Sequence, residues 1–149
     1  MAHLAFLTAH VLAAFLALGT GLATLRGGRW LGTHRVSVLV MSLALPGSIA
    51  AGWADSPGAT RVVFPGLFLL SLAMVVRTEL AARRPPGSPA FIDHVGFTLI
   101  SLVAGFLTVL VLRLGAGPAG AVAAAVAVPL LGRRLLARVQ ADAAAVPAT

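Results

Sequence analysis

The chain contains no cysteine and no lysine, and only four of its 149 residues are acidic. Without cysteine it has no disulfide framework, no thiol nucleophile and no thiolate metal site. It also lacks a glycine-rich phosphate-binding loop, the nucleophile elbow of serine hydrolases and the paired-histidine helix of metalloproteases. Few residues are left that could carry catalysis, and the sequence therefore favours a non-catalytic role.

Charge of either sign is scarce, because only 10% of the residues are charged while 59% are hydrophobic and the mean hydropathy is +1.00. A soluble domain has about a quarter of its residues charged, and a disordered segment combines low hydrophobicity with high net charge. The composition excludes both classes. The net charge of +7 comes from arginines that separate apolar runs. Lipid bilayer is therefore the predicted partner, and nucleic acid is not.

Five apolar runs approach the length of about 20 residues that a membrane-spanning helix needs. The predicted spans cover residues 3–25, 36–54, 61–80, 91–112 and 115–132. The longest connection, residues 83–89, has the proline and glycine content typical of a loop. We predict an all-α integral membrane protein, in which residues 1–149 form one bundle of five transmembrane helices. A bundle of four, with residues 114–132 re-entrant or on the surface, is the alternative.

The arginines are unevenly divided between the two sides of this bundle. Nine lie in residues 26–35, 77–90 and 133–149, and only Arg61 and Arg113 lie in the connections on the other side. The positive-inside rule then places the N-terminus outside and the C-terminus in the cytoplasm of a bacterial inner membrane.

The cytoplasmic rim carries two arginine pairs that are expected to attract anionic lipid headgroups, Arg83 with Arg84 and Arg133 with Arg134. Glu79 lies close in sequence to Arg77, Arg83 and Arg84. This proximity predicts an ion pair at the membrane interface within that segment.

Small residues recur at every fourth position of the first span, at Ala5, Ala9, Ala13, Ala17 and Gly21. This spacing predicts one ridge along a helix face. Burial of apolar surface does not drive helices together in lipid, so close van der Waals contact between small residues is a main source of association. The ridge therefore predicts packing inside the bundle, or against another membrane protein or a second copy.

Histidines are the candidate cofactor ligands. Haem b in a helical bundle needs two histidines at one depth on facing helices, and the predicted topology gives this arrangement only to His34 and His94. His10, about 10 Å inside the first span, is a further candidate. Hydrogen bonding of a histidine to a neighbouring helix is the structural alternative. No metal site is predicted, because Asp93 and these histidines lack a typical ligand spacing.

An internal similarity favours a third kind of function. At an offset of 84 residues, His10, Val11, Leu18, Gly21 and Thr24 recur as His94, Val95, Leu102, Gly105 and Thr108. Because the offset spans three helices, the two segments would have opposite orientations, as in the inverted repeats of many transporters. The near absence of charge at the middle of the membrane argues against an ion or proton path.

A pattern of histidines and glycines links the first two spans. It comprises His10, Gly19 and Gly21, a loop with Gly27, Gly28 and Arg29, and then Gly32, Thr33, His34 and Arg35. It resembles an uncharacterised family of small, predicted multi-span bacterial membrane proteins, which have a histidine-containing helix, a glycine-rich basic loop and a His-Arg pair opening the second helix. The resemblance covers about residues 10–80 and implies a multi-span bundle with no established activity. The family's glycine after the His-Arg pair is replaced here by residues 36–38.

The leading hypothesis is a non-catalytic multi-pass membrane protein, an accessory or structural subunit that packs against other membrane helices. It follows from the small-residue ridge, which is the clearest pattern in the chain. The alternatives are an electron-transfer membrane subunit associated with haem b or quinone, and a small transporter.

Overall fold

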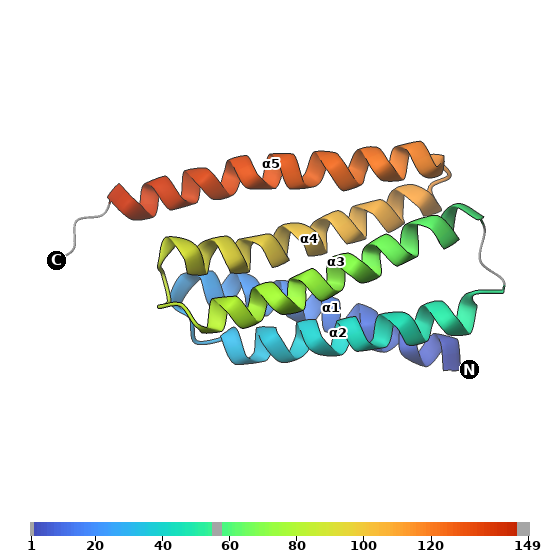
Figure 1. Ribbon diagram of the computed structural model, residues 1–149, viewed down its shortest axis with the longest axis horizontal. Helices are drawn as coiled ribbons and strands as arrows, with labels where there is room; N and C mark the ends of the chain where they lie inside the picture. The colour runs from blue at the N-terminus through green and yellow to red at the C-terminus, as the bar shows by residue number, and fades with distance from the viewer. Residues whose placement is uncertain (1, 55–57, 146–149) are drawn as a thin grey trace.

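The protein is an antiparallel bundle of α-helices (Figure 1), seen in a computed structural model that describes residues 2–54 and 58–145. The helices are α1 (Ala2–Gly27), α2 (Leu31–Gly52), α3 (Gly58–Ala82), α4 (Pro89–Arg113) and α5 (Gly117–Ala145). All five are long and apolar enough to cross a membrane, and the described residues include no strand. The predicted all-α bundle of five helices is confirmed.

Two helix boundaries differ from the prediction by more than three residues, because charged residues were taken as span limits. The second helix begins at Leu31 rather than at residue 36, and the fifth extends to Ala145 rather than ending at residue 132. Arginine is a good helix former and does not end a helix where the apolar run ends. His34 and Arg35 therefore lie inside α2 rather than before it.

The turns between helices contain residues suited to a sharp reversal of the chain. Gly28 and Gly87 have φ of 72° and 80°, a conformation that favours glycine because it has no β-carbon. Ser88 begins α4 by accepting a hydrogen bond from the Phe91 amide at 3.3 Å, and Pro89 occupies the first turn, where its missing N–H costs nothing.

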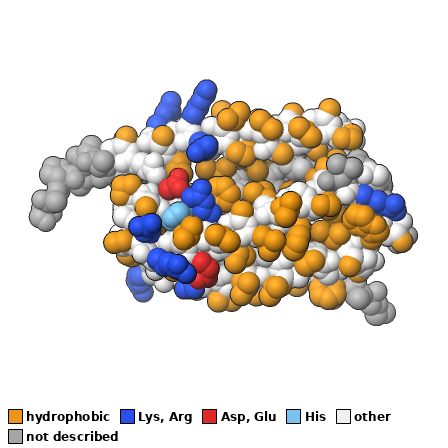
Figure 2. Space-filling view, in the orientation of Figure 1, with side chains coloured by type: hydrophobic (Ala, Val, Ile, Leu, Met, Phe, Trp, Pro, Cys, Tyr) orange, Lys and Arg blue, Asp and Glu red, His pale blue; other side chains and the backbone are white. Residues whose placement is uncertain are grey.

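The bundle has two chemically different ends. The arginine-rich end carries the α1–α2 turn, the α3–α4 turn and the later part of α5, whereas the arginine-poor end carries the start of α1 and the α4–α5 turn. Figure 2 shows basic and acidic side chains gathered toward the arginine-rich end, with apolar side chains over most of the remaining surface. We use these two names for the ends and for the halves of the bundle beside them.

The core extends from the middle of the bundle to the arginine-rich end. One cluster centres on Ala17, Val38 and Met41, where α1 meets α2, and a second contains Phe91 and Val95 of α4. Buried threonines in this half bond to carbonyls on their own helices, as α-helical threonines commonly do. The core therefore includes hydroxyls without leaving most of them unsatisfied.

The small-residue ridge follows this core for only part of its length. Ala13, Ala17 and Gly21 are buried, but Ala5 and Ala9 are exposed on the described chain. An α-helix repeats every 3.6 residues, so a spacing of four turns around the axis by about 40° at each step. The row is therefore not one straight face, and its first two members point away from the core.

Candidate functional site

Three histidines join α1 to α2 through backbone carbonyls. His3 donates from Nδ1 to the Ser48 carbonyl at 3.0 Å, His10 donates to the Met41 carbonyl at 3.0 Å, and His34 donates to the Ala17 carbonyl at 2.9 Å. The three pairs keep one antiparallel register, and successive pairs lie seven residues, or about two turns, apart along each helix. We call these three contacts the histidine ladder.

Glycine makes room for two of the three rungs. A β-carbon added to Gly21 would lie 2.8 Å from Cε1 of His34, and one added to Gly52 would lie 2.8 Å from Cε1 of His3. Each glycine follows the accepting carbonyl by four residues and so lies on the same helix face one turn later. The histidine rings pack where a larger residue would collide with them.

His34 is the fully buried rung, with 0% exposure. Because a carbonyl only accepts, its Nδ1 carries a proton, and in the neutral ring Nε2 is then an acceptor. Thr98 Oγ1 of α4 lies 3.1 Å from that Nε2 and 2.7 Å from the Val95 carbonyl, so its one proton serves one of these acceptors at a time. The imidazole thus links α1, α2 and α4.

The two predicted haem ligands, His34 and His94, have separate protein partners in this structure. Both ring nitrogens of His34 lie within hydrogen-bond distance of protein groups. Nδ1 of His94 lies 3.0 Å from Arg77 Nη1 and accepts its hydrogen bond. His34 contacts Thr98, which lies one turn after His94 on α4, whereas His94 itself contacts Arg77 of α3. The two histidines therefore have different partners.

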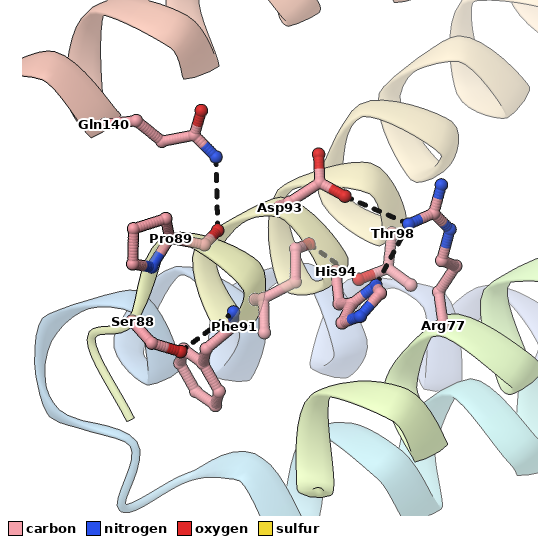
Figure 3. Close-up of polar contacts among 9 residues, drawn as sticks. Arg77, Ser88, Pro89, Phe91, Asp93, His94, Thr98 and Gln140 are labelled. Carbon is pink, nitrogen blue, oxygen red and sulfur yellow. Dashed lines mark hydrogen bonds and ion pairs between the residues drawn. The ribbon is translucent and has the colours of Figure 1, made fainter. Parts of the chain in front are cut away.

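A charged cluster surrounds His94 near the arginine-rich end (Figure 3). Arg77 reaches from α3 to Asp93 on α4, with Nη1 and Oδ2 3.0 Å apart, and its guanidinium lies 4.9 Å from the centre of the Phe97 ring. Gln140 of α5 donates to the Pro89 carbonyl at 3.2 Å. These contacts connect α3, α4 and α5 at a level where both ions remain partly exposed.

Glu79 does not pair within its own segment as expected. It forms a two-pronged ion pair with Arg35 of α2, at 3.0 and 2.5 Å. Residues two apart on a helix do not face one another, so Arg77 and Glu79 point to different neighbours. The other predicted rim residues, Arg83, Arg84, Arg133 and Arg134, are exposed.

A large cavity opens in the arginine-poor half, where α3 and α4 diverge from α1 and α2 (Figure 1). Its volume is about 690 Å³, within the range of about 300–1,000 Å³ typical of ligand sites. His3 and His10 line it, together with mainly apolar residues of the four helices. We call this space the four-helix cavity. Of the predicted ligand residues, it includes His10 but neither His34 nor His94.

A smaller groove of about 310 Å³ lies between α3 and α5, over α4. Figure 2 looks onto this face of the bundle. Ala104, Gly105 and Ala125 form part of its lining, and Arg77, Asp93 and Arg133 lie toward its arginine-rich end. We call it the α3–α5 groove. Thr108 also lines it, and its hydroxyl has no hydrogen-bond partner among the described residues although the residue is 2% exposed.

The 84-residue similarity does not extend to contacts. His10 bonds to a carbonyl of the next helix, whereas His94 accepts from Arg77 of the preceding helix. Gly21 is crowded by His34, but a β-carbon on Gly105 would meet nothing within 4 Å. The matching residues therefore have different surroundings.

Comparison with known proteins gives no relative, since no family model, curated protein or solved structure matches the chain. Within residues 2–54 and 58–145, no three histidine or acidic side chains are grouped so that they could hold a metal ion.

Sequence reasoning missed two features of the site, the histidine ladder and the bridging role of Arg77. The spacing of seven between His3 and His10 was a signal, because it places both on one helix face. No sequence pattern pointed to the contacts of Arg77, because they depend on how α3 packs against α4.

Proposed function

We propose that this chain is a non-catalytic, multi-pass membrane protein that acts as an accessory subunit by packing against another membrane helix. The observation that carries this proposal is the α3–α5 groove, which is lined in part by small residues. Of the described α5 side chains, only Ala121 is buried, so α5 rests on α4 and leaves most of its surface available.

The groove has the properties of a helix-packing surface in lipid. Small residues such as Ala104, Gly105 and Ala125 allow two helix backbones to approach closely. Ala125 lies on the exposed side of this lining, so a helix in the groove would meet small side chains rather than bulky ones. The groove therefore suits a helix with an apolar face.

The charge distribution supports an orientation for this subunit. Nine arginines at one end favour an orientation with the N-terminus outside and the C-terminus in the cytoplasm of a bacterial inner membrane. Trp30 and Trp53, near the two ends, are both exposed, as side chains at a membrane–water interface commonly are. In this orientation Arg83, Arg84, Arg133 and Arg134 meet anionic headgroups of the cytoplasmic leaflet. A reporter protein that is active only in the cytoplasm should therefore be active when it is fused after Thr149.

Cysteine cross-linking tests the proposed contact, because the natural chain has no cysteine that would react. We expect Ala125→Cys, in the groove, to give a cross-linked product of higher mass in intact membranes. Leu43→Cys, on a 67% exposed position of α2 outside the groove, is the matched control and should stay monomeric. Equal cross-linking at both cysteines would contradict the proposal.

Absorption spectra separate the proposal from the haem alternative. Protein purified from haem-supplied cells is expected to show no Soret band before or after dithionite reduction, since His34 and His94 have protein partners. A Soret band with sharp reduced bands that disappears in His34→Ala would favour electron transfer instead.

A further inference from the structure

The four-helix cavity is long and runs inward from one end of the bundle. Along α1 its lining extends from His3 to Ala14, and along α4 from Arg113 back to Ser101. At 1.5 Å per residue these stretches measure about 16–18 Å, roughly half of a bilayer's hydrocarbon thickness of about 30 Å. The cavity therefore has the shape for an extended chain lying parallel to the helices.

The two ends of the cavity differ in polarity. At the inner end the wall is formed mainly by apolar side chains such as Ala14, Met74 and Leu102, with the uncharged hydroxyls of Ser71 and Ser101 among them. At the arginine-poor end it includes His3 and Arg113, the last residue of α4. An apolar interior with a few polar groups at one point is typical of sites that fix the orientation of a bound molecule.

Arg113 supplies a cation to this polar end. No described carboxylate pairs with it, because the two ion pairs within the described residues are Arg35–Glu79 and Arg77–Asp93. Arg61, the other arginine at this end, is held by the Ala54 carbonyl and the Trp53 ring and does not line the cavity. Among the described residues, Arg113 is thus the arginine placed to bind an anion at the cavity mouth.

The histidines add a hydrogen-bond acceptor to the lining of the same cavity. Because Nδ1 of His3 donates to the Ser48 carbonyl, the neutral ring presents Nε2 as an acceptor, and His3 lines the cavity. A ligand hydroxyl inside the cavity would find an acceptor at His3, in addition to the cation that Arg113 offers to an anionic oxygen.

We propose that the four-helix cavity binds one single-chain anionic amphiphile, with its phosphate or carboxylate at Arg113 and its apolar chain extending inward past His10 to Met74. A lysophospholipid, which has one acyl chain, a phosphate and free hydroxyls, has this chemistry. The site is separate from the α3–α5 groove at its polar end, although Leu67, Leu70, Ser101 and Gly105 border both spaces.

Native mass spectrometry of the full chain, released from dodecyl maltoside, tests this proposal. The probe is palmitoyl lysophosphatidylglycerol, and the neutral single-chain detergent is present throughout as a competitor. We expect one saturable equivalent to bind. Arg113→Gln should weaken its binding about tenfold, the effect of losing one charge-assisted hydrogen bond, whereas Arg61→Gln should leave it unchanged.

A second pair of variants tests the chain-binding part. Gly105→Leu should lower binding by filling the cavity, since a β-carbon there meets nothing within 4 Å. Gly66→Leu, an equally open but exposed glycine of α3 outside the cavity, is the control. Gly105 also borders the α3–α5 groove, so Gly105→Leu changes both spaces. Arg113 lines only the cavity, and Arg113→Gln therefore tests the cavity alone.

Three results would overturn the proposal. One is uptake of several lipids without saturation, which indicates lipid around the helices rather than in a site. Another is equal binding to the wild type and Arg113→Gln. The third is displacement of the probe by inorganic phosphate alone, which would indicate a site for a free anion instead of an amphiphile.

Discussion

The two halves of the α1–α2 hairpin share one register and one kind of contact, but their surroundings differ. In the arginine-rich half His34 is fully buried, and both of its ring nitrogens lie near partners. In the arginine-poor half His3 and His10 line a cavity, and each has a described partner only at Nδ1. The same side chain is a core residue at one end and a cavity-wall residue at the other.

This difference shows that pairing of two helices does not decide how tightly the rest of a bundle closes over them. Near the α3–α4 turn, Phe91 and Val95 of α4 complete the core. Farther along, α3 and α4 diverge from the hairpin (Figure 1) and the four-helix cavity begins. The arginine-rich half therefore contributes most of the packing energy, and the other half is available for binding.

Enlarging a buried alanine of the small-residue ridge should lower the free energy of unfolding more than any other change proposed here, and enlarging an exposed one should not. Ala17 has 0% exposure and faces His34, whereas Ala5 is exposed. We expect Ala17→Leu to lower the free energy of unfolding by about 3 kcal/mol through overpacking, and Ala5→Leu to change it by under about 0.5 kcal/mol. Unfolding in mixed micelles titrated with a denaturing detergent, followed by circular dichroism, measures both. Equal losses would remove the distinction between the two halves.

Removing histidines compares the rungs of the ladder directly. His34→Leu leaves Thr98 without its cross-helix partner and disturbs a packed site, so we expect a loss of about 2–3 kcal/mol. His3→Leu, at the exposed end of the same ladder, should cost under about 1 kcal/mol. The same unfolding titration applies. A larger loss of stability in His3→Leu than in His34→Leu would contradict a core located toward the arginine-rich end.

Two neighbouring glycines of α1 provide a matched pair. Gly21→Ala places a methyl group 2.8 Å from both His34 and Leu99, so we expect a loss of about 1–2 kcal/mol as these side chains shift. Gly19→Ala meets nothing within 4 Å and should be neutral or slightly stabilising, because alanine favours a helix over glycine. Thermal unfolding of the two variants side by side measures this difference, and a stabilised Gly21→Ala would contradict the close packing of His34.

The ion pair at the arginine-rich end should have the smallest effect. Arg35 and Glu79 have side chains that are 40% and 48% exposed, so water and salt screen their attraction. We expect Glu79→Gln to cost less than about 1 kcal/mol, and the difference from wild type to shrink as sodium chloride is added. A large, salt-independent loss would mean that this pair is part of the core.

Sequence reasoning predicted the helices well and the site only in part. Apolar runs identify spans without reference to neighbouring helices, so five were found. The position of His34 at the start of the second helix was missed because Arg35 was taken as a boundary. His34 and His94 have different partners, because similar depth does not determine which way a side chain points. Glu79 likewise found its partner on α2 rather than nearby in sequence.

The sequence by itself determined that this chain forms five apolar α-helices, since backbone groups in hydrocarbon must bond within their own segment. It also determined which end carries the arginines. Only the tertiary structure decided that His34 contacts Thr98, that Arg77 contacts Asp93, and that a cavity lies between four helices. These contacts depend on the rotation and divergence of helices that are far apart in sequence, and the packing of side chains sets both.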